Sequence, residues 1–361
     1  MSARYRLRPR LRNVLPFLAA LVTWLYVAAA LWFAFEQITQ LTRDGQEREA
    51  QTWARLTPLR LENLSLLQLV RQSRLLARVT SLSFSLSGRY LAAGSDATDV
   101  TVFDVISNRR VAWFPGAGFY VLDVAFAPDE QTIASAEAGG AIRVWGLTEG
   151  GLLRTLHGHA ADVNALAFSP DGGWLASASS DATVLVWEWR AGRAVRSYPL
   201  NGVAAALAFS ADGRFLAAGD LSGQVWLWRV LEDEPLCRWQ HPGGVTDIRF
   251  QPDSGWVYAA GGNLISSWNA ENCAAGLSFN TPDREPVGKL AFSPDGRLLV
   301  GAGGKWRQPR LWTWSLPDRL MILSGSLPPT AEAVRALAFT PDGRAFVTGS
   351  HDALIRWWGV K

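Results

Sequence analysis

The side chains that could carry out chemistry are few in this chain and lie far apart in its sequence. Only four histidines are available as general acids or bases: His157, His159, His241 and His351. Catalysis needs a base, an acid or a nucleophile at one shared site. No P-loop, GxSxG or HExxH pattern accompanies the histidines. We therefore expect no enzymatic activity and no cofactor.

Aspartates recur in a way that could suggest calcium or paired carboxylates. Each of them follows a short strand-like segment, in strings such as Ser169-Pro170-Asp171-Gly172. Proline and glycine at these positions favour a tight turn, and aspartate is a common turn residue. Because the aspartates occupy the same turn in different repeats, we expect turn residues rather than a metal site: Asp171, Asp212, Asp253, Asp295 and Asp342.

The two cysteines, Cys237 and Cys273, lie in adjacent repeats. No CxxC pair and no His/Cys cluster with zinc spacing occurs, which argues against a structural metal. Both cysteines fall near presumed outer strands, where neighbouring repeats would splay apart beyond the reach of a disulfide. We expect them to remain unbonded.

The elements that must position these residues form a repeat of about 42 residues. One template is clearest in VNALAFSPDGGWLASASSDATVLVW (163–187) and returns at 287–304 and 334–358. Each unit contains three short strands with period-two alternation, and RAVRSYPL (193–200) supplies a fourth. Seven units with this period predict a β-propeller. Their shared phenylalanines are Phe84, Phe126, Phe168, Phe209, Phe250, Phe292 and Phe339.

These residues resemble the WD40 family over 66–361, which implies an all-β, seven-bladed WD40 propeller acting as a non-enzymatic protein-interaction scaffold. The family's stabilising tetrad is matched in full by His159, Ser177, Asp181 and Trp187. Partial matches occur at Thr348, Asp352 and Trp358, and at His241 and Trp268. The resemblance therefore implies that the blade around Asp181 is the one most strongly stabilised by side-chain hydrogen bonds.

The seventh unit stops at Lys361 after three strands. Its fourth strand must come from elsewhere, and LLQLVR (66–71) has the spacing of an outer strand ahead of Val79. Closure of this kind, which the family resemblance also implies, leaves only short and protected edges.

The segment 14–35 contains 22 residues without a charge, long enough to cross a bilayer as a helix. A cleaved signal peptide is an alternative, because Ala28-Ala29-Ala30 resembles a processing site. The apolar run continues past that point, so we expect an uncleaved transmembrane helix that anchors the chain in the lipid bilayer. A soluble buried helix fits poorly, because no face is polar.

The expected orientation follows from the flanking arginines. Five precede the helix in the basic tail, residues 1–13, and only two follow it in residues 36–50. The positive-inside rule then predicts a single-pass protein of the cell membrane, with its N-terminus cytoplasmic and its propeller on the periplasmic or extracellular side. Residues 36–65 are expected to form a helical juxtamembrane stalk that Pro58 ends, with a partner-binding amphipathic helix as the alternative.

The overall charge of +3 does not indicate a nucleic-acid partner. Without the five arginines of the tail, 30 basic residues face 32 acidic ones. The propeller therefore has no general electrostatic attraction for phosphate. We expect the partners to be other proteins, such as subunits of a membrane complex, and no nucleic acid. A membrane-anchored sensor that binds a small ligand in the propeller channel is the alternative.

The candidate partner-binding residues lie where one repeat departs from the others. The last interval between phenylalanines is 47 residues, and its extra length falls in 301–310 and 324–333. Insertions of this kind map to loops that can carry function. An exposed Trp306 beside Lys305, Arg307 and Arg310 would suit an interface, with Phe119 and Tyr120 as weaker candidates. Alternatively, Trp306 folds back on its own blade.

Overall fold

The computed structural model describes residue 47 and residues 49–116, 119–327 and 332–361. The basic tail, the expected transmembrane segment 14–35 and residues 36–46 and 48 of the expected stalk lie outside the described residues. Among the residues that are described, no helix combines the length and apolar character needed to span a bilayer. Residues 49–54 are helical, and a separate compact unit covers Arg55–Lys361.

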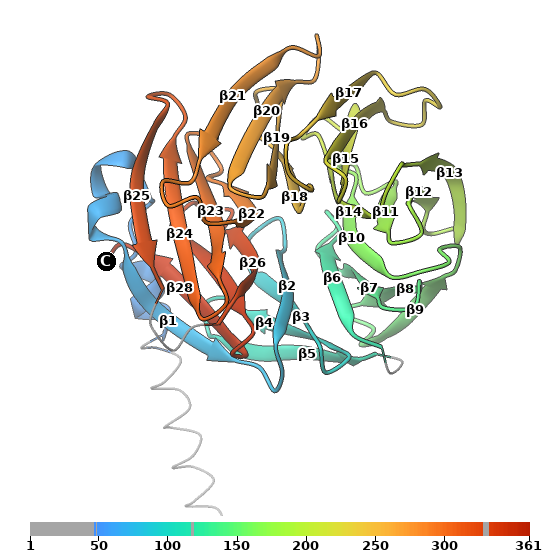
Figure 1. Ribbon diagram of the computed structural model, residues 1–361. Coiled ribbons are helices and arrows are strands. Elements are labelled where there is room, and N and C mark those ends of the chain that lie inside the picture. The colour runs from blue at the N-terminus through green and yellow to red at the C-terminus, as the bar shows by residue number, and fades with distance from the viewer. Residues whose placement is uncertain (1–46, 48, 117–118, 328–331) are drawn as a thin grey trace, which may run out of the picture. The chain divides into compact units, whose positions relative to one another are not determined.

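The unit Arg55–Lys361 is a ring of four-stranded antiparallel sheets, which we number as blades 1–7 (Figure 1). Blade 1 contains β2 (Val79–Phe84), β3 (Tyr90–Ser95), β4 (Asp99–Asp104) and β5 (Arg109–Pro115); blade 2 contains β6 (Val121–Phe126), β7 (Thr132–Glu137), β8 (Ile142–Gly146) and β9 (Gly151–Leu156); blade 3 contains β10 (Val163–Phe168), β11 (Leu175–Ser179), β12 (Thr183–Glu188) and β13 (Arg193–Pro199).

The second half of the ring follows the same order of strands. Blade 4 contains β14 (Ala204–Phe209), β15 (Phe215–Asp220), β16 (Gln224–Arg229) and β17 (Cys237–Gln240); blade 5 contains β18 (Asp247–Phe250), β19 (Trp256–Gly261), β20 (Leu264–Asn269) and β21 (Ala275–Asn280); blade 6 contains β22 (Val287–Phe292), β23 (Leu298–Lys305), β24 (Gln308–Ser315) and β25 (Leu320–Ser326); blade 7 contains β26 (Val334–Phe339), β27 (Ala345–Ser350), β28 (Leu354–Gly359) and β1 (Gln68–Arg74).

The turn chemistry seen in the sequence builds the first hairpin of each blade. In blade 3, the Ser169 hydroxyl donates to Asp171 and accepts from the Trp174 N–H at 2.9 Å, while Gly172 adopts φ +69°. A positive φ of this kind suits glycine. The same hydroxyl-to-carboxylate contact recurs at Asp212, Asp295 and Asp342, whereas Asp253 itself takes φ +51°.

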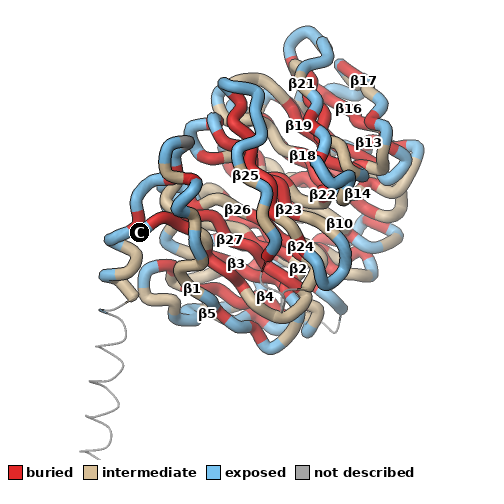
Figure 2. The backbone as a smooth tube through the Cα atoms, turned by 60° about the vertical axis from the view of Figure 1, so that its left-hand side comes forward, coloured by how far each residue is buried: buried red, intermediate tan, exposed pale blue. Residues whose placement is uncertain are grey.

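The core lies between successive blades rather than in one central mass. Second and third strands are buried nearly throughout, whereas outer strands and turns are exposed (Figure 2). Large aromatic side chains fill the space between sheets, among them the fully buried Trp187, Trp228 and Trp314. Burying an aromatic ring removes a large apolar area from water, so blade-to-blade packing supplies much of the stability.

The ring closes through β1, which pairs antiparallel with β28 from Gln68↔Gly359 to Arg74↔Leu354. This strand begins two residues later than the segment 66–71 expected from the sequence. A 3-10 helix, η1 (Leu61–Leu66), precedes it. Leu56, Leu59 and Leu64 are at most 5% exposed. The propeller unit therefore includes part of the expected stalk, because the leucines of this segment pack into the propeller core.

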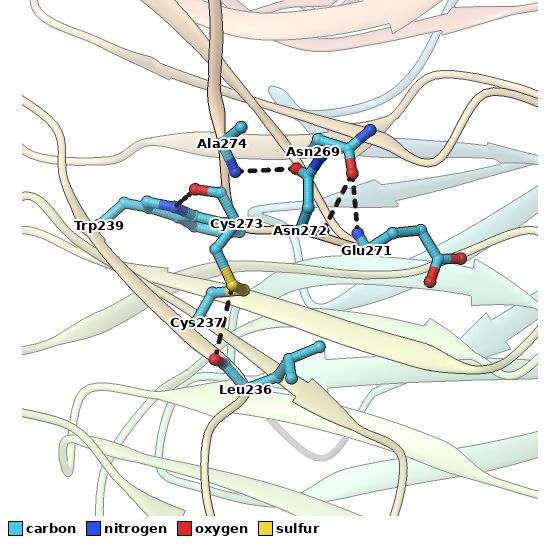
Figure 3. Close-up of a disulfide and its surroundings, with 8 residues drawn as sticks. All are labelled: Leu236, Cys237, Trp239, Asn269, Glu271, Asn272, Cys273 and Ala274. Atoms are coloured by element: carbon cyan, nitrogen blue, oxygen red, sulfur yellow. Dashed lines mark hydrogen bonds between the residues drawn. A yellow bond between two sulfur atoms is a disulfide. The ribbon is translucent and has the colours of Figure 1, made fainter.

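The expectation that the cysteines stay unbonded is wrong, because Cys237 and Cys273 form a disulfide with a Cα–Cα distance of 5.7 Å (Figure 3). Around the disulfide, the outer part of blade 4 packs directly against the outer part of blade 5. Trp239 stacks on Trp268 with ring centroids 5.2 Å apart, and its Nε1 donates to the Cys273 carbonyl at 2.9 Å. This contact brings the turn between β20 and β21 back to β17, which the sequence could not reveal.

The first insertion in the sixth repeat also differs from expectation. Residues 301–310, expected as a loop, instead extend the hairpin of β23 and β24, whose register continues to Lys305↔Gln308. Trp306 and Arg307 form its two-residue turn, and Arg307 has φ +64°. The extra residues therefore project Trp306 on a regular two-stranded support.

Candidate functional site

The tetrad of blade 3 comes together around the Ser177 hydroxyl. His159 Nε2 lies 2.7 Å from this oxygen, and Trp187 Nε1 donates to it at 2.8 Å. His159 Nδ1 contacts Asp181 Oδ2 at 2.9 Å, and the same oxygen accepts the Ala160 N–H. These four side chains tie the second and third strands to the chain that enters the blade.

A Ser-His-Asp contact of this order resembles the arrangement used for nucleophilic catalysis. Ser177 is completely buried, however, and the His159 side chain has no exposed surface. The Ser177 hydroxyl oxygen also accepts a hydrogen bond from the Trp187 indole N–H. A substrate therefore has no path to this hydroxyl, and the tetrad acts as a structural clamp.

Electrostatics agree with a structural role for the tetrad. Burial lowers the pKa of His159 below its ordinary value, although the hydrogen bond and charge of Asp181 act in the opposite direction. Burial raises the pKa of Asp181, but hydrogen bonds from Thr183, Ala160 and His159 outweigh it and hold that pKa below normal. The histidine is therefore neutral near pH 7 and the carboxylate is ionised.

Blade 7 holds its partial tetrad through a residue that the sequence analysis missed. Trp358 Nε1 donates to Thr348 Oγ1 at 3.0 Å, as in blade 3. In place of a histidine, the fully buried Arg356 donates to Asp352 at 3.2 Å. In blade 2, Arg143 pairs with Glu137 from the equivalent position, two residues before the tryptophan. An arginine two residues before the tryptophan of the third strand could therefore have indicated this ion pair from the sequence.

In blade 5 the partial match does not form a hydroxyl-centred clamp. His241 is fully buried, and its Nδ1 lies 2.9 Å from the Gly243 carbonyl. Its ring meets Trp268 edge-on, with centroids 6.5 Å apart. Burial lowers the pKa of His241. These two residues support the entry into the blade by packing.

The first strands surround a channel of about 480 Å³ with a charged wall. Asp123 accepts the Leu166 N–H at 2.7 Å, and Asp247 accepts the Leu290 N–H at 2.8 Å. Each carboxylate therefore ties its own blade to the next. Burial raises the pKa of Asp123, against the lowering effects of Ser81 and Leu166 and of the more distant Lys289 and Arg249.

These channel residues were also missed from the sequence, although a signal exists. The third residue of β10, β14 and β26 is alanine, whereas β6 and β22 carry Asp123 and Lys289 there. Asp247 is paired with Arg249 at 3.4 Å. Asp123 and Asp247 therefore act as joints between neighbouring blades.

Trp306 lies at the rim where the second strands end and the third strands begin. Its side chain is 52% exposed, and the ring meets His351 of blade 7 edge-on with centroids 4.9 Å apart. Arg335 Nε in turn contacts His351 Nε2 at 2.7 Å. The Trp306 ring therefore contacts blade 7 rather than folding back on blade 6, and about half of the residue's surface is exposed to solvent.

The basic neighbours of Trp306 are held in different ways. Lys305 pairs with Glu285 at 2.9 Å, and Arg310 forms an ion pair with Asp283. Arg307, in the turn, has no ion pair with any described residue. Burial lowers the pKa of His351, and the charges of Arg335 and Arg78 add to this effect. The rim thus presents an aromatic ring and a free guanidinium over a neutral histidine.

Phe119 and Tyr120 lie on the same rim in blade 2 and are 53% and 58% exposed. The Phe119 ring packs over Gly139, because a Cβ atom placed on this glycine would lie 3.5 Å from the ring. Within the part of the chain that is described, no contact joins these residues to Trp306. The structure therefore gives two separate aromatic groups on one rim.

Comparison with known proteins agrees with this architecture. The family model described as "WD domain, G-beta repeat" matches residues 72–104, 108–146, 150–188, 196–229, 234–269 and 317–359, more than half of the chain. Among curated relatives, the chain is 23% identical over 252 residues to the transcriptional corepressor LEUNIG_HOMOLOG of Arabidopsis thaliana, covering 69% of this chain and 26% of that protein.

Two further relatives match shorter segments. Protein tipD of Dictyostelium discoideum is 29% identical over 24% of this chain and 14% of its own length. The mouse WD repeat and HMG-box DNA-binding protein 1 is 32% identical over 21% of this chain and 7% of its own length. The chain thus spans about a quarter or less of each relative. Seven blades, the clamp around Ser177 and the repeat matches together show that the chain belongs to the WD40 family.

Proposed function

We propose that this protein is a membrane-tethered interaction platform whose propeller binds a partner protein at the rim around Trp306. The observation that carries the proposal is the half-exposed tryptophan held by a regular hairpin against His351. Rigid, partly exposed aromatic residues with nearby arginine are typical of interface hot spots. The WD40 family membership adds support, because propellers of this family commonly serve as interaction scaffolds.

The disulfide supports the part of the proposal that concerns location. Disulfides persist in oxidising compartments and are rare where thiols are kept reduced. The bond between Cys237 and Cys273 therefore agrees with a propeller on the periplasmic or extracellular side, as the arginine tail and the apolar segment 14–35 predict. The tether would then hold the platform at the membrane surface.

Thiol labelling in intact cells tests the location. A membrane-impermeant maleimide should label neither cysteine in the native protein. After a reductant is added, Cys273 should react, whereas Cys237 is 5% exposed and should stay protected. Protease added outside spheroplasts should digest the propeller and spare the arginine tail. Free thiols in the native protein, or a propeller that resists protease until the membrane is broken, would overturn the proposed sidedness.

Recovery of partners tests the platform itself. The full-length protein should be cross-linked in its own membranes, solubilised and purified, and the accompanying proteins quantified. We expect at least one protein at a constant ratio to the chain. Recovery of the chain alone, both with and without cross-linking, would contradict the proposal.

A further inference from the structure

A second hollow lies between blades 5 and 6, at the end of the blades opposite to Trp306. It has a volume of about 630 Å³, within the range of ligand-binding sites. Its wall includes the side chains of Trp256, Leu277 and Leu316. β24 runs from the turn that contains Trp306 to Leu316, which follows its last residue. The length of this strand therefore separates the two regions by about 25 Å.

The wall on the side of blade 5 is held open by small residues and by the disulfide. A side chain at Gly276 would begin only 2.2 Å from the Trp256 ring, so the ring lies directly across β21. Ala275 and Gly276 follow Cys273, which is bonded to Cys237 of blade 4. The bond fixes the start of β21 toward blade 4. The groove is therefore a fixed feature of this pair of blades.

The charge at the edge of the groove is positive. Arg297 and Arg319 line it and are exposed, and neither forms an ion pair with any described residue. The acidic residue in the lining is Asp295, whose Oδ1 accepts the Ser293 hydroxyl and the Arg297 N–H within its own turn. By contrast, Arg214 and Arg193 are paired with carboxylates. Two guanidiniums at the groove thus remain available to a partner's carboxylates.

The surface beyond the groove is apolar. Arg319 leads directly into β25, where Leu320, Met321 and Ile322 are 63%, 39% and 38% exposed. Outer strands are usually protected by charged residues, and β1, β5, β9, β13 and β17 each contain an arginine. The outer strands of the two blades that border the groove, β21 and β25, contain no charged residue. The exposed side chains of β25 extend the groove into a longer strip that a small molecule could not cover.

We propose that the groove between blades 5 and 6, together with the apolar edge of β25, binds an extended protein segment rich in carboxylates and apolar side chains. Its apolar side chains cover Trp256 and Leu277 and continue along β25, while its carboxylates pair with Arg297 and Arg319. This surface is independent of the rim around Trp306. A propeller with both surfaces can hold two partners at once.

Selection of random nine-residue peptides displayed on phage, against the full-length protein, tests the proposal. We expect enrichment of peptides that combine Asp or Glu with Leu, Ile or Phe. Synthetic copies should bind at least tenfold more weakly to the variant Arg297→Glu/Arg319→Glu. Arg229→Glu is a matched control, since it changes an exposed arginine at the same end of blade 4.

The outcomes separate this proposal from the function proposed for the rim. Trp306→Ala should leave peptide binding unchanged even if it abolishes recovery of the membrane partner. Because both arginines are exposed, the charge-reversed variant should fold normally, which its thermal unfolding will show. No enrichment of acidic peptides, or equal binding to wild type and the charge-reversed variant, would overturn the proposal.

Discussion

Ser177 illustrates how one buried hydroxyl can organise a blade. Its oxygen accepts the Trp187 N–H and contacts His159. Replacing it with alanine leaves two buried polar groups without a partner, which costs about 1–3 kcal/mol for each group. We expect Ser177→Ala to lower the free energy of unfolding by about 2–6 kcal/mol in a denaturant titration.

An exposed serine provides the control for this substitution. Ser326→Ala, on the outer strand β25, should change the free energy of unfolding by less than about 0.5 kcal/mol. Equal effects of the two substitutions would show that the clamp contributes nothing beyond an ordinary surface contact.

Three histidines with lowered pKa values make stability depend on pH. Burial lowers the pKa of His159, His241 and His351 below the ordinary 6.5. Between the folded-state pKa and about 6.5, the unfolded chain binds more protons than the folded one, so the free energy of unfolding falls as pH decreases. Asp123 and Glu137 act in the opposite direction, since burial raises their pKa values.

A variant isolates the histidine effect from that of the carboxyl groups. His241→Asn removes one titrating group and keeps a polar side chain near Gly243. Between pH 7.5 and 5.5, wild type should lose more stability than this variant when both are unfolded by denaturant. Parallel curves for the two proteins would mean that His241 has the same pKa in the folded and unfolded chains.

At the scale of elements, the hairpins could be predicted because their signals are local. Ser169, Asp171 and Gly172 lie within four residues and specify one turn. The disulfide could not be predicted in this way, since it depends on Trp239 stacking against the next blade. The same limit applies to Asp123, whose bond to the Leu166 N–H joins strands of two different blades. The pair of Arg356 and Asp352 spans only four residues, so its signal was local.

The seam offers a test of how the ring is closed. A chain that starts at Leu75 lacks β1 and η1, so the edge of β28 is unpaired and the core loses Leu59 and Leu64. We expect this chain to aggregate or to be destabilised by several kcal/mol. A chain that starts at Arg55 keeps these elements and should remain stable. Size-exclusion chromatography and thermal unfolding of both chains check this, and similar melting temperatures would contradict the role of β1.

For the whole molecule, the repeat period was enough to predict the ring, because seven similar units can bury their faces only against one another. The surfaces used for binding follow no such rule. Trp306 was identified from its unusual repeat, but its contact with His351 and its hairpin support required the folded ring. The groove between blades 5 and 6 is lined by residues from two repeats, so it could not be predicted from the sequence of either repeat alone.

Binding of a partner at the rim is tested most directly by removing the Trp306 side chain and measuring recovery of the membrane partner together with thermal stability. Trp113→Ala is the matched control, because Trp113 is similarly exposed at 50% but lies on the outer strand β5. We expect Trp306→Ala to reduce recovery of the cross-linked partner by about tenfold or more, with a melting temperature within a few degrees of wild type. Trp113→Ala should leave recovery unchanged. Undiminished recovery with Trp306→Ala, or a loss that accompanies early melting, would contradict a binding site at this rim.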